Sequence, residues 1–430
     1  MAEDLKRELG LIEVTLSGIG IILGAGIYAL LGEAAALAGN AVWMSFVLAA
    51  LVALFTGLSY AEFSSMMPGA GAEYLYAREA FGPHLAFMTG WLIILGGAVG
   101  AAAVSLGFAG YLTALTGADP TTSGLVLLLA MTAVLLLGIK ESARAAVVLT
   151  FVEIAGLLLV IYVGLPRLGS VDYMEMPQGG SGVLAAAALV FFAYKGFEEM
   201  VKLSDETRVP EKTMPMGILV AICASIGLYV LVSICSVSVL GWSQLASSSA
   251  PFAEIARYAV GQEAYVLVSL IALASTANTA LLMILAASRI TYGMARAGSL
   301  PSILGLVHEG RRTPAAAILA VSVLTALFLL AGDLSLAASV ANFTVFLVFM
   351  IVNASLVILR HRQPQRPRPF KVPVSFHWLP VLPILGIMLT AFLMLQLQRW
   401  AMITGAAMAL AGLAVSAIAL GLARWRDAKR

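Results

Sequence analysis

The chain has 430 residues, of which 61% are apolar and only 11% are charged. A soluble domain has roughly 25% charged residues, so this chain has too few charges to cover a water-facing surface. Its apolar content excludes intrinsic disorder, and the scarcity of charge argues against a cytosolic enzyme or a nucleic-acid binder. The two cysteines, Cys223 and Cys235, lie in one apolar run, where buried thiols are expected rather than a disulfide framework or a metal site. The composition therefore predicts a multi-pass membrane protein.

Twelve apolar runs are long enough to cross a bilayer, whose hydrocarbon core of about 30 Å needs roughly 20 apolar residues. They lie near residues 12–38, 42–66, 84–115, 123–139, 146–165, 182–203, 216–240, 265–296, 314–332, 337–359, 379–397 and 400–423. Residues 1–10 are charged and lack the cleavage site of a signal peptide, so the first run is expected to stay in the protein. We predict an all-α integral membrane fold with twelve transmembrane helices.

The basic residues are distributed very unevenly over the predicted loops. If the N-terminus lies in the cytoplasm, the cytoplasmic segments hold 20 of the 25 basic residues. The outer segments hold only Arg167, Arg257 and Arg399, and the spans themselves hold Lys195 and Arg289. Because cytoplasmic loops of membrane proteins are enriched in lysine and arginine, this distribution predicts that both termini are cytoplasmic. The basic, proline-rich segment 360–371 is then expected to be a connector that faces lipid headgroups.

Two of the predicted spans are interrupted. The first has glycines at positions 18, 20, 24 and 26, and the sixth carries Lys195, Glu198 and Glu199 about halfway along an apolar run. The glycines alone are equally typical of close helix packing. For the sixth span the alternative is an early end near Ala193, which would leave about 12 residues, too few to cross a bilayer. We therefore interpret both spans as broken helices.

The two interruptions lie five spans apart, which indicates an internal repeat. Each opens a block of five spans, and because five is odd, the second block enters the membrane from the opposite side. The predicted units are residues 1–166 for the first repeat, 167–360 for the second, inverted repeat, and 361–430 for the basic loop with helices 11 and 12. Broken helices at corresponding places in two repeats predict a substrate site near the middle of the membrane.

Four motifs, in this order, resemble those of the amino acid–polyamine–organocation (APC) superfamily. They are Gly24-Ala25-Gly26-Ile27-Tyr28 in span 1, Ala61-Glu62-Phe63 with Pro68 to Tyr74 after span 2, Phe191-Phe192-Ala193-Tyr194 with Gly196 to Glu198 in span 6, and Leu203 to Pro215 after span 6. The resemblance covers about residues 10–400. It implies the LeuT-type 5+5 inverted fold with two additional C-terminal helices. It also implies secondary transport of amino acids across the cell membrane and no enzymatic activity.

The resemblance further implies where an amino acid binds. An unwound helix offers N–H groups to a carboxylate and C=O groups to an ammonium. The expected carboxylate ligands are the amides around Gly24, Ala25, Gly26 and Ile27, and the expected amine ligands are the carbonyls around Phe191, Phe192 and Tyr194. The position of Phe192 holds an aromatic outer gate in the resembled family, and ordinary core packing is the alternative for this residue.

Lys195 departs from the resembled family, which usually has an apolar residue at this position. A charge at this depth costs at least ~2.5–3.5 kcal/mol, so the side chain should face the interior and find a partner. An ion pair with Glu198 or Glu199, three and four residues later, is one interpretation; titration of Lys195 or contact with the substrate is the other. Some exchangers of the family carry a proton-sensing glutamate at the position of Glu198, so this residue is a candidate for proton coupling.

Glu153 lies in span 5, where proton-coupled members of that family often carry lysine, so a lysine proton switch cannot be carried over. An acidic residue inside the membrane is a functional candidate by default. It would exchange a proton in each cycle or help to bind a cation, and a structural hydrogen bond in its neutral form is the alternative. Ser275 in span 8 is expected to face it. Glu62 and Arg289, near the cytoplasmic ends of spans 2 and 8, are candidates for an inner gate.

The predicted function is amino acid transport by alternating access, coupled to an ion. A proton is the expected coupling ion and sodium is the alternative. A polyamine or organic-amine carrier and an amino acid exchanger are the competing transport functions, and an ion channel or an intramembrane enzyme would belong to another class. The sequence contains no phosphate loop, catalytic set or metal motif, so we expect no cofactor and no nucleic-acid partner. The expected partners are the amino acid and the lipid bilayer.

Overall fold

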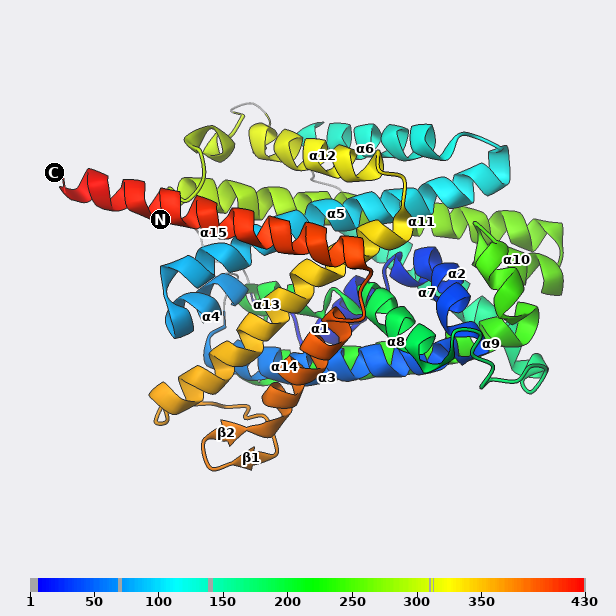
Figure 1. Ribbon diagram of the computed structural model, residues 1–430, viewed down its shortest axis with the longest axis horizontal. Coiled ribbons are helices and arrows are strands. Elements are labelled where there is room, and N and C mark those ends of the chain that lie inside the picture. The colour runs from blue at the N-terminus through cyan, green and yellow to red at the C-terminus, as the bar shows by residue number, and fades with distance from the viewer. Residues whose placement is uncertain (1–6, 69–71, 138–141, 309–310, 312, 429–430) are drawn as a thin grey trace.

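The computed structural model describes residues 7–68, 72–137, 142–308, 311 and 313–428, without the side chains of residues 142–149 and 418–428. These residues form a bundle of α-helices with short 3₁₀ segments and one small hairpin (Figure 1). Gly69, Ala70 and Gly71 of the second motif, and charges used for orientation such as Lys6 and Lys140, lie outside the described residues.

In chain order the elements are α1 (Leu11–Ile22), α2 (Gly26–Ala38), η1 (Gly39–Ala41), α3 (Val42–Met66), α4 (Ala72–Phe81), α5 (Pro83–Thr116), α6 (Pro120–Leu137), α7 (Ser142–Gly164), η2 (Leu165–Arg167), α8 (Gly179–Val190), η3 (Phe191–Tyr194), η4 (Phe197–Glu206), α9 (Pro210–Ser247), α10 (Pro251–Ala259), α11 (Gln262–Arg296), η5 (Ser302–Gly305), α12 (Ala315–Leu329), α13 (Leu334–Arg362), β1 (Ser375–Phe376), β2 (Leu379–Pro380), α14 (Val381–Met394) and α15 (Arg399–Ala428), where η denotes a 3₁₀ helix. Four α-helices begin at a proline, whose missing N–H costs nothing in the first turn. α13 begins after Asp333, whose carboxylate accepts the N–H of Leu336 at 2.8 Å.

The described residues contain nine helical runs that are long and apolar enough to cross a membrane, and α1, α12 and α14 are shorter apolar helices. Each of the twelve predicted ranges overlaps one of these runs or helices, and the run Gly26–Met66 extends over parts of the first two ranges. The prediction of an all-helical, multi-pass membrane protein is confirmed. The number of crossings and their pairing into two repeats stay predictions.

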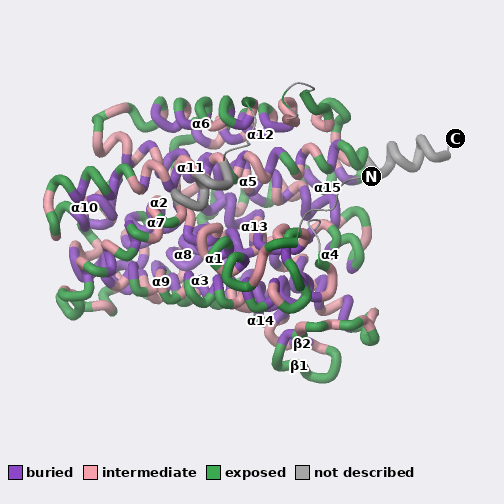
Figure 2. Tube along the Cα trace, turned by 180° about the vertical axis from the view of Figure 1, so that it is seen from behind, coloured by how far each residue is buried: buried purple, intermediate pink, exposed green. Residues whose placement is uncertain are grey.

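The burial pattern separates an inner helix from outer ones (Figure 2). Most residues of α5 are buried, whereas α6 exposes large apolar side chains such as Leu129 and Leu137, which are 68% and 64% exposed. Exposed apolar surface on that scale suits a lipid environment.

The expectation that both cysteines are buried is wrong for Cys223, which is exposed on α9, and right for Cys235. A membrane helix can expose such a side chain because its surroundings are apolar too.

The first span is broken between α1 and α2. α1 ends at Ile22, and α2 begins again at Gly26 after a turn in which Leu23 has φ −74° and ψ +46°. The N–H of Gly24 bonds to the carbonyl of Ile22 at 2.8 Å, a tighter turn than an α-helix makes. The predicted interruption is confirmed.

The sixth span is broken between α8 and η4. After α8 the chain continues as η3, becomes extended at Lys195, and turns at Gly196 with φ +123°. A Cβ at Gly196 would be strained at this φ and would lie 2.7 Å from the carbonyl oxygen of Ile21. This interruption was also predicted, but the 3₁₀ form of Phe197–Glu206 was not. The early end of the span near Ala193 was correctly set aside, since helical structure resumes at Phe197.

Glu62 is the most completely paired charge in the described chain. Its side chain on α3 is 0% exposed and lies between two arginines. Arg360 belongs to the last turn of α13, and Arg368 lies in the loop after it. Arg360 contacts both carboxylate oxygens, with Nε at 2.9 Å from Oε1, and Arg368 places Nε at 3.1 Å from Oε1. The backbone N–H of Val372 donates to Oε2 at 2.8 Å. We call Glu62, Arg360, Arg368 and Val372 the carboxylate clamp.

The segment 360–371 therefore lies against the protein, and its expected position at the lipid headgroups stays a prediction. Arg366 pairs with Glu79 on α4, and Arg362 donates to the carbonyl of Ala80 at 2.9 Å. Phe370 and Ser65 exchange hydrogen bonds at the end of α3. The basic residues of this loop are used to attach it to α3 and α4, which a count of loop charges does not reveal.

We expect Glu62→Gln to lower the free energy of unfolding by about 3–5 kcal/mol, because two nearly buried guanidinium groups lose their counter-charge. Thermal unfolding of the purified protein in detergent measures the effect. Glu79→Gln is the matched control: its ion pair is about one-third exposed, and the expected loss is about 1 kcal/mol or less. Equal shifts for the two variants would contradict the clamp.

Candidate functional site

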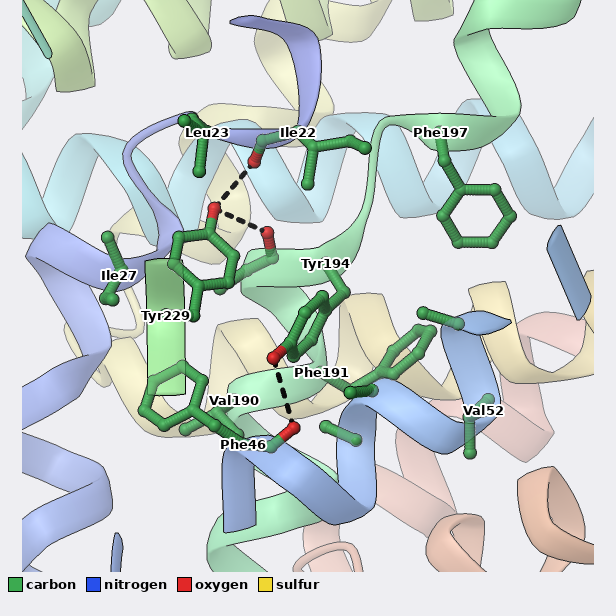
Figure 3. Close-up of a cluster of buried hydrophobic side chains, with 14 of the residues drawn as sticks. Ile22, Leu23, Ile27, Phe46, Val52, Val190, Phe191, Tyr194, Phe197 and Tyr229 are labelled. Atoms are coloured by element: carbon green, nitrogen blue, oxygen red, sulfur yellow. Dashed lines mark hydrogen bonds between the residues drawn. The ribbon is translucent and has the colours of Figure 1, made fainter. Parts of the chain in front are cut away.

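The two helix breaks lie directly against each other. An added Cβ at Gly26, in the first turn of α2, would lie 2.7 Å from the Cα of Ala193 in η3. An added Cβ at Gly196 would likewise lie 2.7 Å from the carbonyl oxygen of Ile21, so the two breaks are in close contact at a second point. Figure 3 shows Ile22, Leu23 and Ile27 of the first break beside Phe191 and Tyr194 of the second. The predicted association of the two interrupted segments is thus present in the fold.

Tyr229 of α9 bridges the two breaks, and the sequence analysis missed it. Its hydroxyl lies 2.7 Å from the carbonyl oxygen of Ile22 and 3.0 Å from that of Ala193 (Figure 3). Its side chain is 0% exposed. A hydroxyl has one hydrogen, so it fully serves only one of the two carbonyls at a time. The only signal in the sequence is a tyrosine in the middle of an apolar run, which has no distinctive spacing.

Gly24 and Ala25 lie in the first break, and Gly26 and Ile27 begin α2. The N–H of Ala25 donates to Oγ1 of Thr279 on α11 at 3.1 Å. The next N–H groups belong to the first turn of a 13-residue helix and have no acceptor within that helix. This end of α2 is therefore suited electrostatically to an anion.

The aromatic residues of the second break face different neighbours. Phe191 packs against Phe346 and Phe349 of α13, with ring centroids 4.7 Å and 5.8 Å apart. Tyr194 donates to the carbonyl of Phe46 on α3 at 3.1 Å. Phe192 is 3% exposed and belongs to a separate apolar cluster that also contains Ala25 and Val99.

Asn342 of α13 completes the polar contacts of this region and was also missed. Its amide nitrogen donates to the carbonyls of Ala188 and Leu189 at 2.8 Å and 2.9 Å, at the end of α8. The carbonyl of Phe192 accepts the N–H of Lys195 at 3.4 Å, and that of Ala193 is used by Tyr229. Some of the carbonyls expected to bind an amine therefore already have protein donors.

Lys195 forms no ion pair with any carboxylate in the described part of the chain. Its ammonium lies 4.8 Å from the ring centroid of Phe192. Glu198 instead accepts the N–H of Gly196 at 2.8 Å, and Glu199 pairs with Lys202. The ion pair that was one interpretation of Lys195 is not formed, because the extended backbone at this residue removes the helical i+3 and i+4 spacing.

Glu153 of α7 is 2% exposed, and its Oε1 has no hydrogen-bond partner among the described residues. Ser275 of α11 lies beside this carboxyl, as expected, but its hydroxyl is also without a completed hydrogen bond. The backbone carbonyl of Glu153 accepts from the hydroxyl of Tyr28 at 2.7 Å, which fixes α7 against α2. A buried acid with incomplete hydrogen bonding is costly and marks a candidate functional group.

The family model described as "Amino acid permease" matches residues 9–418. The chain belongs to the amino acid permease family. The expected membership in the APC superfamily is thereby confirmed.

Individual permeases and transporters are similar over almost the whole chain. The branched-chain amino acid permease BcaP of Bacillus subtilis is 34% identical over 417 residues, covering 92% of this chain and 89% of that protein. The methylthioribose transporter of the same species is 32% identical over 407 residues, covering 90% and 87%. A vacuolar cationic amino acid transporter 2 of Arabidopsis thaliana is 30% identical over 397 residues, covering 85% of this chain and 62% of that protein.

Tyr229→Phe tests whether the hydroxyl bridge between the two breaks stabilises this permease. Removing the hydroxyl takes the donor from the buried carbonyl of Ala193, whereas that of Ile22 keeps the N–H of Gly24, and we expect a loss of about 1–3 kcal/mol in unfolding free energy. Tyr162→Phe is the control, since Tyr162 is 76% exposed and should change stability little. Thermal unfolding in detergent measures both, and an unchanged Tm for Tyr229→Phe would show that the bridge is dispensable.

Proposed function

We propose that this permease is a secondary transporter that moves amino acids across the cell membrane by alternating access. The observation that carries the proposal is the direct contact of two helix breaks that share Tyr229, in a chain of the amino acid permease family. Breaks at membrane depth provide unpaired backbone groups where a zwitterion can lose its water without meeting hydrocarbon. The relatives named for branched-chain and cationic amino acids support this class of substrate.

The proposed architecture has twelve crossings in a LeuT-type arrangement. Residues 1–166 form the first repeat, residues 167–360 form the inverted repeat, and residues 361–430 add two helices, with both termini in the cytoplasm. The distribution of basic residues and the positions of the two breaks support this topology.

The proposed binding mode uses both breaks. The free amides at the start of α2, around Gly26 and Ile27, bind the carboxylate of the substrate. The carbonyl of Ile22 accepts the N–H of Gly24 as well as the hydroxyl of Tyr229, so a substrate ammonium can supply the donor that the carbonyl of Ala193 lacks when Tyr229 donates to Ile22. Phe192, which packs beside Ala25, is proposed to close the site as the outer gate.

Gly26→Ala is expected to reduce substrate binding and uptake by at least about tenfold, because the added Cβ would lie 2.7 Å from the Ala193 backbone and push the two breaks apart. Counterflow in proteoliposomes measures uptake. Gly227→Ala is the control, since a Cβ at Gly227 on α9 meets nothing within 4 Å. Unchanged uptake by Gly26→Ala would rule out binding at this junction.

Coupling is proposed for two acids near the breaks, the buried Glu153 with its unpartnered Oε1 and the partly buried Glu198. Glu153 with Ser275 is the first candidate and Glu198 the second. A carboxyl that is protonated in one conformation and ionised in the other would link proton movement to transport. If the cycle uses sodium instead, the oxygens of Glu153 and Ser275 would be its ligands. No other cofactor is proposed.

Glu153→Gln is expected to remove the pH dependence of uptake while substrate binding survives, because the amide keeps the shape of the side chain but cannot exchange a proton. Uptake at several external pH values measures this. Glu211→Gln, at an exposed position at the start of α9, is the control. Unchanged pH dependence in Glu153→Gln would exclude Glu153 as the coupling group, and a sodium requirement of the wild type would favour the cation-ligand role.

A proteoliposome panel tests the function as a whole. It compares neutral, cationic and acidic amino acids with polyamines and methylthioribose, with and without pH and sodium gradients. Saturable counterflow of amino acids is the expected result. Transport of amines alone would assign the protein to the organic-amine carriers, and unsaturable ion flux would indicate a channel.

A further inference from the structure

The ammonium of Lys195 lies among three helical elements that offer it no negative charge. It stands over the ring of Phe192, and a Cβ on Gly100 of α5 would lie 3.5 Å from its Nζ. The same Cβ would lie 3.1 Å from the sulfur of Met283 on α11. An aromatic ring of η3, a glycine of α5 and, beside that glycine, a thioether of α11 thus lie around the ammonium.

The acidic residues closest in sequence are bound elsewhere. Glu198 and Glu199 act on Lys195 electrostatically, yet neither comes within 4 Å of it in the described structure. Glu198 accepts the N–H of Gly196, and Glu199 is paired with Lys202. A cation–π contact contributes about 0.5–2 kcal/mol, which offsets only part of the cost of desolvating an ammonium. No protein carboxylate in the described structure therefore pairs directly with the ammonium of Lys195 when it is protonated.

Lys195 is one of a few residues at the breaks that are partly accessible to solvent. It is only partly buried, whereas its neighbours Tyr194 and Phe197 are 1% and 0% exposed. Gly24, Thr279 and Met283 are partly accessible in the same way. Thr279 and Met283 lie one turn apart on α11, and the first contacts the start of α2 while the second lies beside Lys195. The ammonium and the positive end of α2 thus face neighbouring turns of one helix.

Two positive features side by side favour a ligand with two negative groups. A neutral zwitterion brings one carboxylate, which the start of α2 can bind, and leaves the ammonium of Lys195 unpaired. A cationic side chain would be repelled by it. We propose that Lys195 binds a carboxylate on the substrate side chain, so that the preferred substrates are acidic amino acids. This inference rests on the proposed function, and none of the relatives described above is named for an acidic amino acid.

The test compares uptake of glutamate, leucine and lysine by the purified protein in proteoliposomes. We expect the wild type to prefer glutamate. Lys195→Met should lower the ratio of glutamate to leucine uptake about tenfold or more, because the lost charge pair discriminates directly between these side chains. Lys195→Arg should keep most of the preference. Lys212→Met, at an exposed position on α9, changes the net charge equally and should leave the ratio unchanged.

A second measurement does not depend on the variants. Glutamate should raise the Tm of the wild-type protein in detergent more than leucine does at the same concentration. A wild type that transports and is stabilised by neutral or cationic amino acids alone would overturn the inference and leave the proposed function standing. An unchanged uptake ratio in Lys195→Met would overturn it as well. A wild type that transports no amino acid would overturn the proposed function itself.

Discussion

The structure depends on one constraint: a backbone N–H or C=O inside a membrane has no water to bond and must find a partner within the protein. An unbroken helix meets this requirement by itself, but a broken one does not. Here the partners come from other helices. Tyr229 of α9 serves the carbonyls of Ile22 and Ala193, Thr279 of α11 accepts the amide next to the first break, and Asn342 of α13 donates to the end of α8. The breaks thereby determine which helices must surround them, and the central contacts of the bundle follow from satisfying them.

The same reasoning separates structural charges from functional ones. Glu62 is enclosed by donors from Arg360, Arg368 and a backbone amide, so its charge is compensated within the protein and attaches the loop after α13 to α3. Its role in an inner gate stays a prediction beside this attachment. Glu153 and Lys195 have no such enclosure in the described structure. A charge that the protein neutralises stabilises the fold, whereas one that it leaves incomplete keeps interaction energy available for a ligand or an ion.

The sequence was sufficient to predict the features that depend on local composition. The apolar runs predicted the helices, and the glycines and mid-span charges predicted both interruptions. The meeting of the two breaks was predicted, but most other contacts between distant segments were not. Neither Tyr229 with Ile22, 207 residues apart, nor Arg360 with Glu62, 298 residues apart, leaves a periodic trace in the sequence. The expected pairing of Lys195 failed for a related reason. It assumed helical spacing, and that spacing is lost where the backbone is extended.

The shared hydroxyl of Tyr229 suggests why a bound substrate would change the balance between conformations. When the hydroxyl donates to Ile22, which also accepts the N–H of Gly24, the carbonyl of Ala193 is left without this donor. Under the proposed binding mode the substrate ammonium removes this deficit, and it does so only while the two breaks remain in contact. A ligand shifts an equilibrium only by its difference in affinity between the two states. Because the missing hydrogen bond is located where the end of α1 meets η3, ligand binding would favour the conformations that keep this junction intact. The surrounding helices would then be the parts that move.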